Sequence, residues 1–394
     1  MTGALHGIRV LDLTEYVAGP YCTKLLADFG AEVIKVERPS TGDPVRDTPP
    51  FLKVRDGGTN GILFNYLNTN KRSVAIDIGT DFGKIMLRRA ARQCNVVVEN
   101  FSSVEAKSLG FDCKALLREN PELVVTSIPM FEENSPYSHW KLSELSLYAL
   151  SGLMGLVGGE GKPPIKAGGY QGQLMAGAHA AALTLFAVNG SMTTGQGSWI
   201  EASALASCAK IFAHMSEYTT IATESGLPPD IRRERQSGVL PCKDGFITVT
   251  LYYFQMEQLG QMLEITGLAD DPRYSSEQNL QANQYELKKE ISKWLATRTA
   301  DEAQDEAQAR RLLFTKVSTT QDLLESAHLQ ERKYFKTVKL PGSGEVTFPG
   351  APFRLSETPM SEISAAPILG EANQEFLVDF LNFSNADLVE QDLK

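Results

Sequence analysis

Apolar residues near the N-terminus fall in short runs that are separated by polar turns and amphipathic stretches. Residues 8–13 predict a buried strand, residues 21–29 a helix that stops at Gly30, and residues 31–37 a second strand. A strand, turn, helix and strand in this order favour parallel pairing with a right-handed crossover. We therefore predict an α/β fold with a doubly wound parallel sheet.

The strand pattern continues along the first half of the chain, with helices in between. Further strands are predicted at 73–78, 95–98, 123–128 and 198–203. Before the last of these, a glycine-rich loop runs into an apolar, alanine-rich helix that continues to about residue 188. Such a helix start offers free N–H groups and a positive dipole end to an anion or a carboxylate. Its first turn carries Gln173, an amide that is neither charged nor nucleophilic, so the reactive group of a site is missing.

Composition changes after Gly226, where a polar linker begins. Residues 246–251 predict a strand, and residues 255–330 are helical in pattern and highly charged. Residues 338–359 are strand-like and rich in Pro and Gly, and residues 371–382 predict a terminal helix. A chain of 394 residues exceeds what one core normally supports, so we predict two domains, the smaller one α-rich.

Charge and composition exclude several classes of protein. A net charge of −10 argues against nucleic acid as a partner. The five cysteines form no CxxC pair and the five histidines no HExxH, so we expect no metal and a reducing, cytoplasmic setting. Asp12 and Glu15 interrupt any signal-peptide run, and we expect no stretch of about 20 apolar residues that spans a membrane. The first turn lacks GxGxxG, which argues against a nicotinamide dehydrogenase.

Several basic residues lie near predicted strand ends and suggest a crevice for a diphosphate or a nucleotide. This set comprises Lys35, Arg38, Arg46, Lys71 and Arg72. Asn100 and Phe101 follow the fourth strand and offer an amide and an aromatic ring to an adenine or an acyl group. Scattered surface charge and a simple strand-end turn explain the same residues, and both interpretations stay open.

Ordered motifs along nearly the whole chain resemble family III CoA-transferases, the superfamily of formyl-CoA transferase, carnitine CoA-transferase and α-methylacyl-CoA racemase. The matching segments are residues 9–14 with 18–20, 26–39 with 42–43, 70–73, 99–101, 120–121, 150–154, 350–359 and 366–371. The resemblance implies a large Rossmann-like domain built from residues 1–225 and 336–394. It also implies a small domain inserted with its linkers at 226–335, and two chains interlocked as a dimer.

The resemblance implies coenzyme A or an acyl-CoA as substrate, and no tightly bound cofactor. Carried over residue by residue, the CoA-contacting positions are Tyr16, Val17, Ala18, Arg38, Lys71, Arg72, Asn100 and Phe101. The sequence departs from the family pattern where chemistry is carried. Gln173 stands where family transferases have the aspartate that attacks the thioester. The other departures are Ser143 and Glu144 at the racemase pair, Ser102, Ser103 and Ser108 at basic positions, and Ser237-Gly238 at a glycine-rich loop.

Three hypotheses follow. In the first, the chain is the non-catalytic subunit of a heteromeric transferase and pairs with a homologue that carries the aspartate. In this subunit arrangement the chain resembles succinyl-CoA:benzylsuccinate CoA-transferases, in which succinyl-CoA is the donor and benzylsuccinate is the acceptor. In the second, the chain is active through a relocated carboxylate at Glu144 or Glu160. In the third, it is a CoA-binding scaffold or an inactive homodimer. Under the first hypothesis we expect negligible activity and weak CoA binding from the chain alone.

Overall fold

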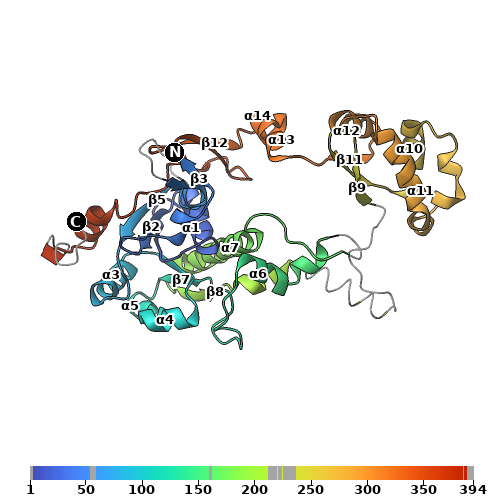
Figure 1. Cartoon of the computed structure of the whole chain (residues 1–394). Coiled ribbons are helices and arrows are strands. Elements are labelled where there is room, and N and C mark those ends of the chain that lie inside the picture. Colours follow the sequence, from blue (N-terminus) through green and yellow to red (C-terminus); the bar gives the residue numbers. More distant parts are fainter. Residues whose placement is uncertain are drawn as a thin grey trace. The chain divides into compact units, whose positions relative to one another are not determined.

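The computed structural model describes residues 3–53, 59–158, 162–211, 220, 224, 237–384 and 386–387 (Figure 1). The chain divides into two compact units. The larger unit comprises residues 1–157, 164–229 and 333–394, and the smaller one comprises 158–163 and 230–332. The prediction of an α/β fold whose larger part is built from both ends of the chain is confirmed.

The larger unit is organised around a six-stranded sheet in the order β5-β2-β1-β6-β7-β8, in which every neighbouring pair is parallel. The strands are β1 (Arg9–Asp12), β2 (Glu32–Glu37), β5 (Lys71–Ala75), β6 (Val96–Glu99), β7 (Val124–Ser127) and β8 (Ser198–Glu201). Counted along the sheet, this is the Rossmann order, which reverses between β1 and β6. Ligands of such sheets bind at the carboxyl ends of the strands beside that reversal.

Strand residues alternate between two apolar cores, one on each face of the sheet. Val10 and Val33 face the core beneath four helices, whereas Leu11 and Ile34 face the opposite core. The four helices are α1 (Ala18–Asp28), α6 (Glu144–Leu150), α7 (Gln171–Thr194) and α8 (Ala204–Lys210). The other face is covered by α3 (Asp81–Ala91), α5 (Cys113–Glu119) and a π-helical turn, Gln374–Phe380. Burial on both faces explains why the strands read as continuous apolar runs.

Shorter elements complete the larger unit. They are the hairpin β3 (Phe51–Lys53) with β4 (Thr59–Gly61), the 3-10 turn Pro44–Asp47, α2 (Ile62–Leu67), α4 (Ser103–Leu109) and the hairpin β12 (Phe335–Leu340) with β13 (Gly344–Pro349). Val338, Leu340 and Phe348 of the second hairpin form a small core with partly buried Leu52 and Tyr66. Segments from both ends of the sequence therefore share one core.

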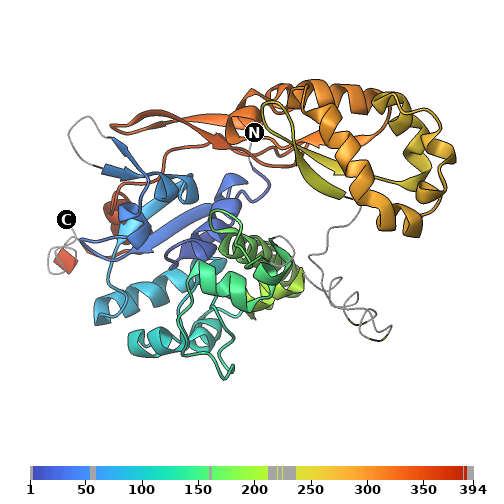
Figure 2. The ribbon, with the colours of Figure 1, turned by 45° about the vertical axis from the view of Figure 1, so that its right-hand side comes forward.

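The smaller unit holds a three-stranded antiparallel sheet in the order β11-β10-β9. Its elements are β9 (Ser237–Pro241), β10 (Phe246–Thr250), β11 (Leu313–Lys316), α10 (Met256–Leu263), α11 (Glu277–Leu295), α12 (Ala300–Ala309), α13 (Thr320–Glu325) and α14 (Ala327–Glu331). Helices α10, α11 and α12 pack against this sheet around one apolar core (Figure 2). The predicted strand at 246–251 corresponds to β10. The prediction of an entirely helical stretch at 255–330 is wrong at β11, where Phe314 alone is fully buried and leaves no alternation to recognise.

Two other predicted elements differ in extent. α7 continues to Thr194, beyond the predicted end near residue 188, and stops where Gly195 adopts a left-handed conformation. By length and composition α7 is apolar enough to cross a membrane, and one third of its most apolar window is buried. The expectation that no such stretch exists is therefore wrong, although α7 lies in the core against α1 and the sheet. β5 begins at Lys71, two residues before the predicted strand, because Lys71 already pairs with Val33 of β2.

α1 and α7 approach each other closely at Gly177. A Cβ atom at Gly177 would lie 2.4 Å from the Ala18 carbonyl oxygen and 3.2 Å from Cβ of Tyr21. Two backbones come this near only where one helix has no side chain. Gly190, further along α7, has open space around the same position.

Replacing these two glycines should therefore have opposite effects. We expect Gly177→Ala to lower the free energy of unfolding by about 1–3 kcal/mol, because the added methyl group forces the two helices apart. We expect Gly190→Ala to be neutral or to stabilise by up to about 1 kcal/mol, since alanine is the better helix former. Urea unfolding of both variants measures this, and an equal response of the two would contradict the close packing described above.

Candidate functional site

The turn after β1 is held by side chains instead of glycines. Asn100, just after β6, accepts the Glu15 N–H at 3.0 Å and donates its own amide to the Glu15 carbonyl at 2.8 Å. Asp43 accepts the Tyr16 N–H at 3.3 Å, and this stabilises the left-handed backbone of Tyr16, whose φ is 69°. Side chains accept the hydrogen bonds of the Glu15 and Tyr16 N–H groups. These N–H groups are therefore not free to bind a phosphate, as the N–H groups of a glycine-rich turn are.

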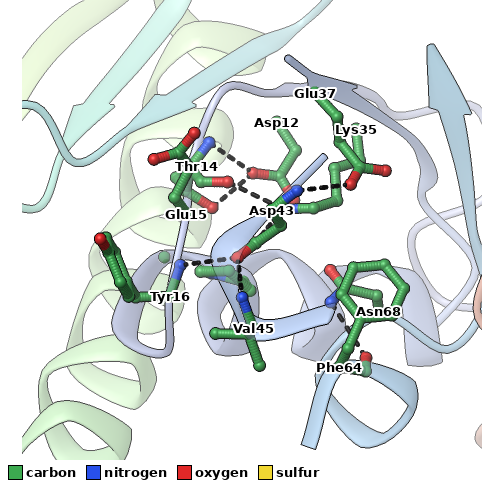
Figure 3. A network of polar contacts seen from close by, with 12 residues as sticks. Asp12, Thr14, Glu15, Tyr16, Lys35, Glu37, Asp43, Val45, Phe64 and Asn68 are labelled. Atoms are coloured by element: carbon green, nitrogen blue, oxygen red, sulfur yellow. Dashed lines mark hydrogen bonds and ion pairs between the residues drawn. The ribbon is translucent and has the colours of Figure 1, made fainter. Parts of the chain in front are cut away.

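Thr14, at the start of the same turn, is tied to two buried charges. Its N–H and hydroxyl both donate to Asp12 Oδ1, at 3.0 and 2.6 Å, and its carbonyl accepts from Lys35 Nζ at 2.8 Å. Lys35 Nζ also lies 2.9 Å from Asp43 Oδ2, and Lys71 Nζ lies 3.0 Å from Asp12 Oδ2. All four charged side chains are fully buried. Figure 3 shows Asp12, Lys35 and Asp43 gathered around this turn.

The buried charges shift one another's protonation equilibria. Burial opposes the charge of Asp12, but Lys71 and Lys35 outweigh it and hold the pKa of Asp12 well below its usual range. Burial likewise disfavours protonated Lys35, yet Asp43 and Asp12 raise its pKa above the ordinary value. For Lys71 burial is the larger effect, and its pKa falls to about 8. Lys35 is therefore protonated at neutral pH.

Glu37, the last residue of β2, joins the next segment to this network. It accepts two hydrogen bonds from Arg46, at 2.8 and 2.7 Å, one from Ser73 at 2.6 Å and the Asp43 N–H at 3.0 Å. Burial opposes ionisation of Glu37, but the bonds from Arg46 outweigh it and lower the pKa of Glu37. The guanidinium group of Arg46 is thus engaged by Glu37 within the larger unit.

A cavity of about 530 Å³ opens at the carboxyl ends of β1, β2, β5 and β6, beside the reversal of the sheet. It brings together four of the predicted site residues, Tyr16, Arg38, Asn100 and Phe101. Ser108, predicted to stand at a basic position, also lines it.

The other four predicted cations do not line this cavity. Lys71 begins β5, and its side chain reaches Asp12 at the carboxyl end of β1, where Asp12, Asn68 and the Pro20 carbonyl enclose its ammonium group. Arg72 pairs with Glu375 at 3.0 Å. Lys35 and Arg46 belong to the buried network described above. Val17 and Ala18 are buried beneath the turn and are not part of the cavity lining.

Arg38 is the one cation among the described residues that line the cavity, and Glu15 pairs with it. Arg38 Nη2 lies 2.9 Å from Glu15 Oε2, with 64% of the arginine side chain and 20% of the glutamate side chain exposed. Burial raises the pKa of Glu15, and the Arg38 charge opposes that rise. Glu37, Asp77 and Glu105 add three further carboxylates to the lining. The cavity is acidic, a property that the sequence analysis missed although these acids lie within a few residues of the predicted positions.

The start of α7 is capped by a carboxylate from another helix. Glu144 begins α6, and its two oxygens accept the N–H groups of Gly172 at 2.9 Å and Gln173 at 3.2 Å. These N–H groups have no partner within their own helix, and the N-cap residue Tyr170 supplies none. Glu144 and Gln173 are both buried. The sequence gives no signal for this cap, because the two segments are 28 residues apart.

Two further predicted features lie at the border of the described structure. Glu160 falls outside the described residues. Ser237 and Gly238 begin β9 of the smaller unit. Within the described part of the chain, no group of three or more His, Cys, Asp or Glu side chains is placed to hold a metal ion.

Comparison with known proteins gives consistent matches along the chain. The model of CoA-transferase family III matches residues 5–373. The chain is 32% identical to succinyl-CoA:mesaconate CoA-transferase of Haloarcula hispanica, over 95% of this chain and 96% of that protein. It is 30% identical to formyl-CoA:oxalate CoA-transferase of Streptomyces avermitilis, over 98% of each. It is 29% identical to succinyl-CoA–D-citramalate CoA-transferase of Chloroflexus aurantiacus, over 98% and 96%.

Solved structures share the fold. A CaiB/BaiF family protein of Brucella suis superposes with a TM-score of 0.85 at 24% identity, over 96% of this chain and 100% of that one. A protein of Mycobacterium tuberculosis gives a TM-score of 0.82 at 24% identity, over 95% and 99%. At this level of identity the likeness concerns the fold alone.

Breaking the buried pair at the turn should be costly. We expect Lys35→Met to lower the free energy of unfolding by about 3–5 kcal/mol, because it leaves Asp43 charged, buried and without its ammonium partner. The matched control is Lys339→Met, an exposed lysine of strand β12, for which we expect a change within about 0.5 kcal/mol. Denaturant unfolding of both variants measures the difference, and comparable stabilities would show that the pair does not hold the turn.

Proposed function

The chain belongs to CoA-transferase family III, and we propose that it is the subunit of a heteromeric transferase that does not carry the nucleophile. The complex would move CoA from an acyl-CoA donor, such as succinyl-CoA, to a carboxylic acid. A homologous chain with an aspartate at the position of Gln173 would perform the covalent steps. The cavity lined by Tyr16, Arg38, Asn100 and Phe101 is our candidate for the CoA site of this chain.

Gln173 is the observation that carries this proposal. In the family chemistry a carboxylate attacks the thioester carbonyl and expels CoA thiolate, which gives an acyl–aspartyl anhydride. The thiolate then attacks the aspartyl carbonyl, releases the first acid and leaves an aspartyl-CoA thioester for the acceptor acid. An amide at this position supplies no carboxylate for the first step.

Glu144 is the alternative nucleophile, because its carboxylate lies beside Gln173. Its two oxygens are engaged by the N–H groups of Gly172 and Gln173, and the residue is only 8% exposed. An attack on a thioester would uncover both N–H groups at the start of α7. We therefore favour a structural role for Glu144 and rank relocated catalysis second.

The names of the relatives support a dicarboxylic acid as acceptor. Those proteins are named for mesaconate, D-citramalate and oxalate. Benzylsuccinate, the acceptor suggested by the resemblance, belongs to the same chemical class. We propose this class for the complex.

Exposed apolar side chains on α7 support pairing with a second chain. Leu183 and Leu185 are 38% and 37% exposed, and Phe186 and Met192 are 72% and 77% exposed. Monomeric soluble proteins rarely leave such groups together in water, so a partner suits this surface. A homologous chain that carries the aspartate would also supply the missing chemistry, which a second copy of this chain would not.

We expect no acyl adduct on this chain when it is purified alone and mixed with succinyl-CoA, because no described carboxylate replaces the aspartate. Co-expression with a neighbouring family III gene should restore transfer, with the adduct on the partner's aspartate. Trapping with hydroxylamine or borohydride, followed by peptide mass spectrometry, locates the adduct. Gln173→Asp in the lone chain shows whether the amide alone accounts for the inactivity.

Three results would separate the alternatives. An adduct on Glu144, Glu160 or any other residue of the lone chain would establish relocated catalysis. A tagged chain that native mass spectrometry finds only as a homodimer, with all activity in the untagged protein, would contradict the heteromer. CoA binding without transfer in any combination would indicate a scaffold.

Glu15 should weaken CoA binding, because it occupies the one arginine of the cavity. We expect Glu15→Gln to tighten binding of CoA by about three- to tenfold, since freeing Arg38 adds a charge-assisted hydrogen bond to phosphate in a largely exposed setting. Glu32→Gln is the matched control, because Glu32 pairs with Arg9 and does not line the cavity. Calorimetry with CoA decides it, and unchanged affinity in Glu15→Gln would place the phosphates elsewhere.

A further inference from the structure

A second cavity, of about 280 Å³, opens at the carboxyl ends of β6, β7 and β8. Helix α4 lies between it and the candidate CoA cavity, since residues of α4 line both. We propose that this second cavity binds a small organic cation, a protonated primary amine with a compact aromatic or aliphatic body. Among the described residues, the site shares only Phe101 with the candidate CoA cavity, and the proposal does not rest on the transferase chemistry proposed above.

Carboxylates at two strand ends supply the acceptors for such a cation. Glu99 is the last residue of β6, is 5% exposed and accepts the Phe101 N–H at 2.7 Å. Glu201 is the last residue of β8 and accepts the Glu133 N–H at 2.6 Å. A carboxylate offers about four lone-pair positions, so each has acceptor capacity left for a donor in the cavity. An ammonium group carries three donors and suits this pair.

Aromatic side chains form the apolar walls. The cavity is lined by Phe101, Phe111, Phe131 and Trp199. The rings of Phe101 and Phe111 pack edge to face, with 5.4 Å between their centroids. Trp199 is fixed in place because its indole N–H donates to Ser127 Oγ at 2.8 Å. Aromatic faces attract cations and shield them from water, and they also accommodate an apolar ligand body.

The charge of the lining selects against the substrates of the transferase reaction. Glu99, Asp112, Glu133 and Glu201 outnumber Lys107 and Lys114, and both lysines are exposed. Acyl-CoA and carboxylic acids are anions, which this surface repels. A cation is the ligand that the lining favours.

Binding should depend on pH, because Glu99 gains a proton near neutrality. Burial above all, with smaller contributions from Glu201 and Glu105, raises the pKa of Glu99 to about 7 against the opposing hydrogen bonds from Ser127 and the Phe101 N–H. Cys113 of α5, on another wall, is an uncharged thiol, since burial raises its pKa to about 12. Lys107 and Lys114 contribute two positive charges at the surface. A bound cation favours ionised Glu99, so affinity should rise from about pH 6 to about pH 8.

Three ligands of nearly the same size test the charge preference on the full chain. They are phenethylamine, the neutral phenethyl alcohol and the anionic hydrocinnamate. We expect calorimetry to show the amine binding at least about tenfold more tightly than the alcohol, and the anion more weakly than either. Glu99→Gln keeps the acceptor for the Phe101 N–H and should weaken only the amine, by about tenfold. The control is Glu122→Gln, an exposed acid near the amino end of β7.

Two results with the unmodified chain would overturn the site, and a third comes from the variants. One is equal binding of amine and alcohol, or tighter binding of the anion. The other is no binding of any of the three at millimolar concentration. Glu201→Gln serves as a second variant if Glu99→Gln unfolds, and it should weaken the amine selectively as well. An amine affinity that is unchanged in a folded Glu99→Gln or Glu201→Gln variant would likewise contradict the proposal.

Discussion

The ion pair between Lys35 and Asp43 holds the turn at the carboxyl end of β1, on which the neighbouring parts of the larger unit depend. Lys35 donates a hydrogen bond to the Thr14 carbonyl, and Asp43 accepts one from the Tyr16 N–H. One buried ion pair therefore fixes two backbone groups of the turn after β1. Buried pairs of this kind contribute little net stability compared with apolar residues of the same size. What this pair provides is a defined backbone path, including the left-handed Tyr16, without a glycine.

The same turn leads into α1 and so connects the strand ends to α7. Gly177 lets α7 lie against the first residue of α1, and Gln173 lies one helical turn earlier on the same face of α7. Glu144 fixes the other end of this arrangement by capping the start of α7. The backbone around position 173 is therefore held by contacts with two neighbouring helices, α1 at Gly177 and α6 at Glu144.

Local patterns in the sequence were sufficient for the sheet. Runs such as Val10–Leu13 and Val96–Val98 are apolar throughout because their strands are buried on both faces, and the glycine at 30 marks the end of α1. The family motifs were equally legible, since they are contiguous. β11 was missed because a strand with a single buried residue shows no alternation of apolar and polar positions.

The charges could not be assigned from the sequence for a different reason. In the sequence, Lys35, Arg38 and Lys71 are all basic residues near strand ends. In the structure Lys35 and Lys71 are buried beside carboxylates, whereas Arg38 lines the cavity. Which carboxylate meets which cation depends on contacts between residues far apart in the chain, such as Lys71 with Asp12 or Glu144 with Gln173. For this reason, four of the five cations singled out by their charge do not line the cavity beside the sheet reversal.

The separation of the buried charges from position 173 has an evolutionary consequence. Folding relies on Lys35, Asp43 and their neighbours, whereas turnover in this family relies on a carboxylate carried by a different helix. After a gene duplication, one copy can lose that carboxylate and still inherit an intact surface for meeting its sibling. Natural selection can then act on the two copies separately, one retained for its reaction and the other for its shape.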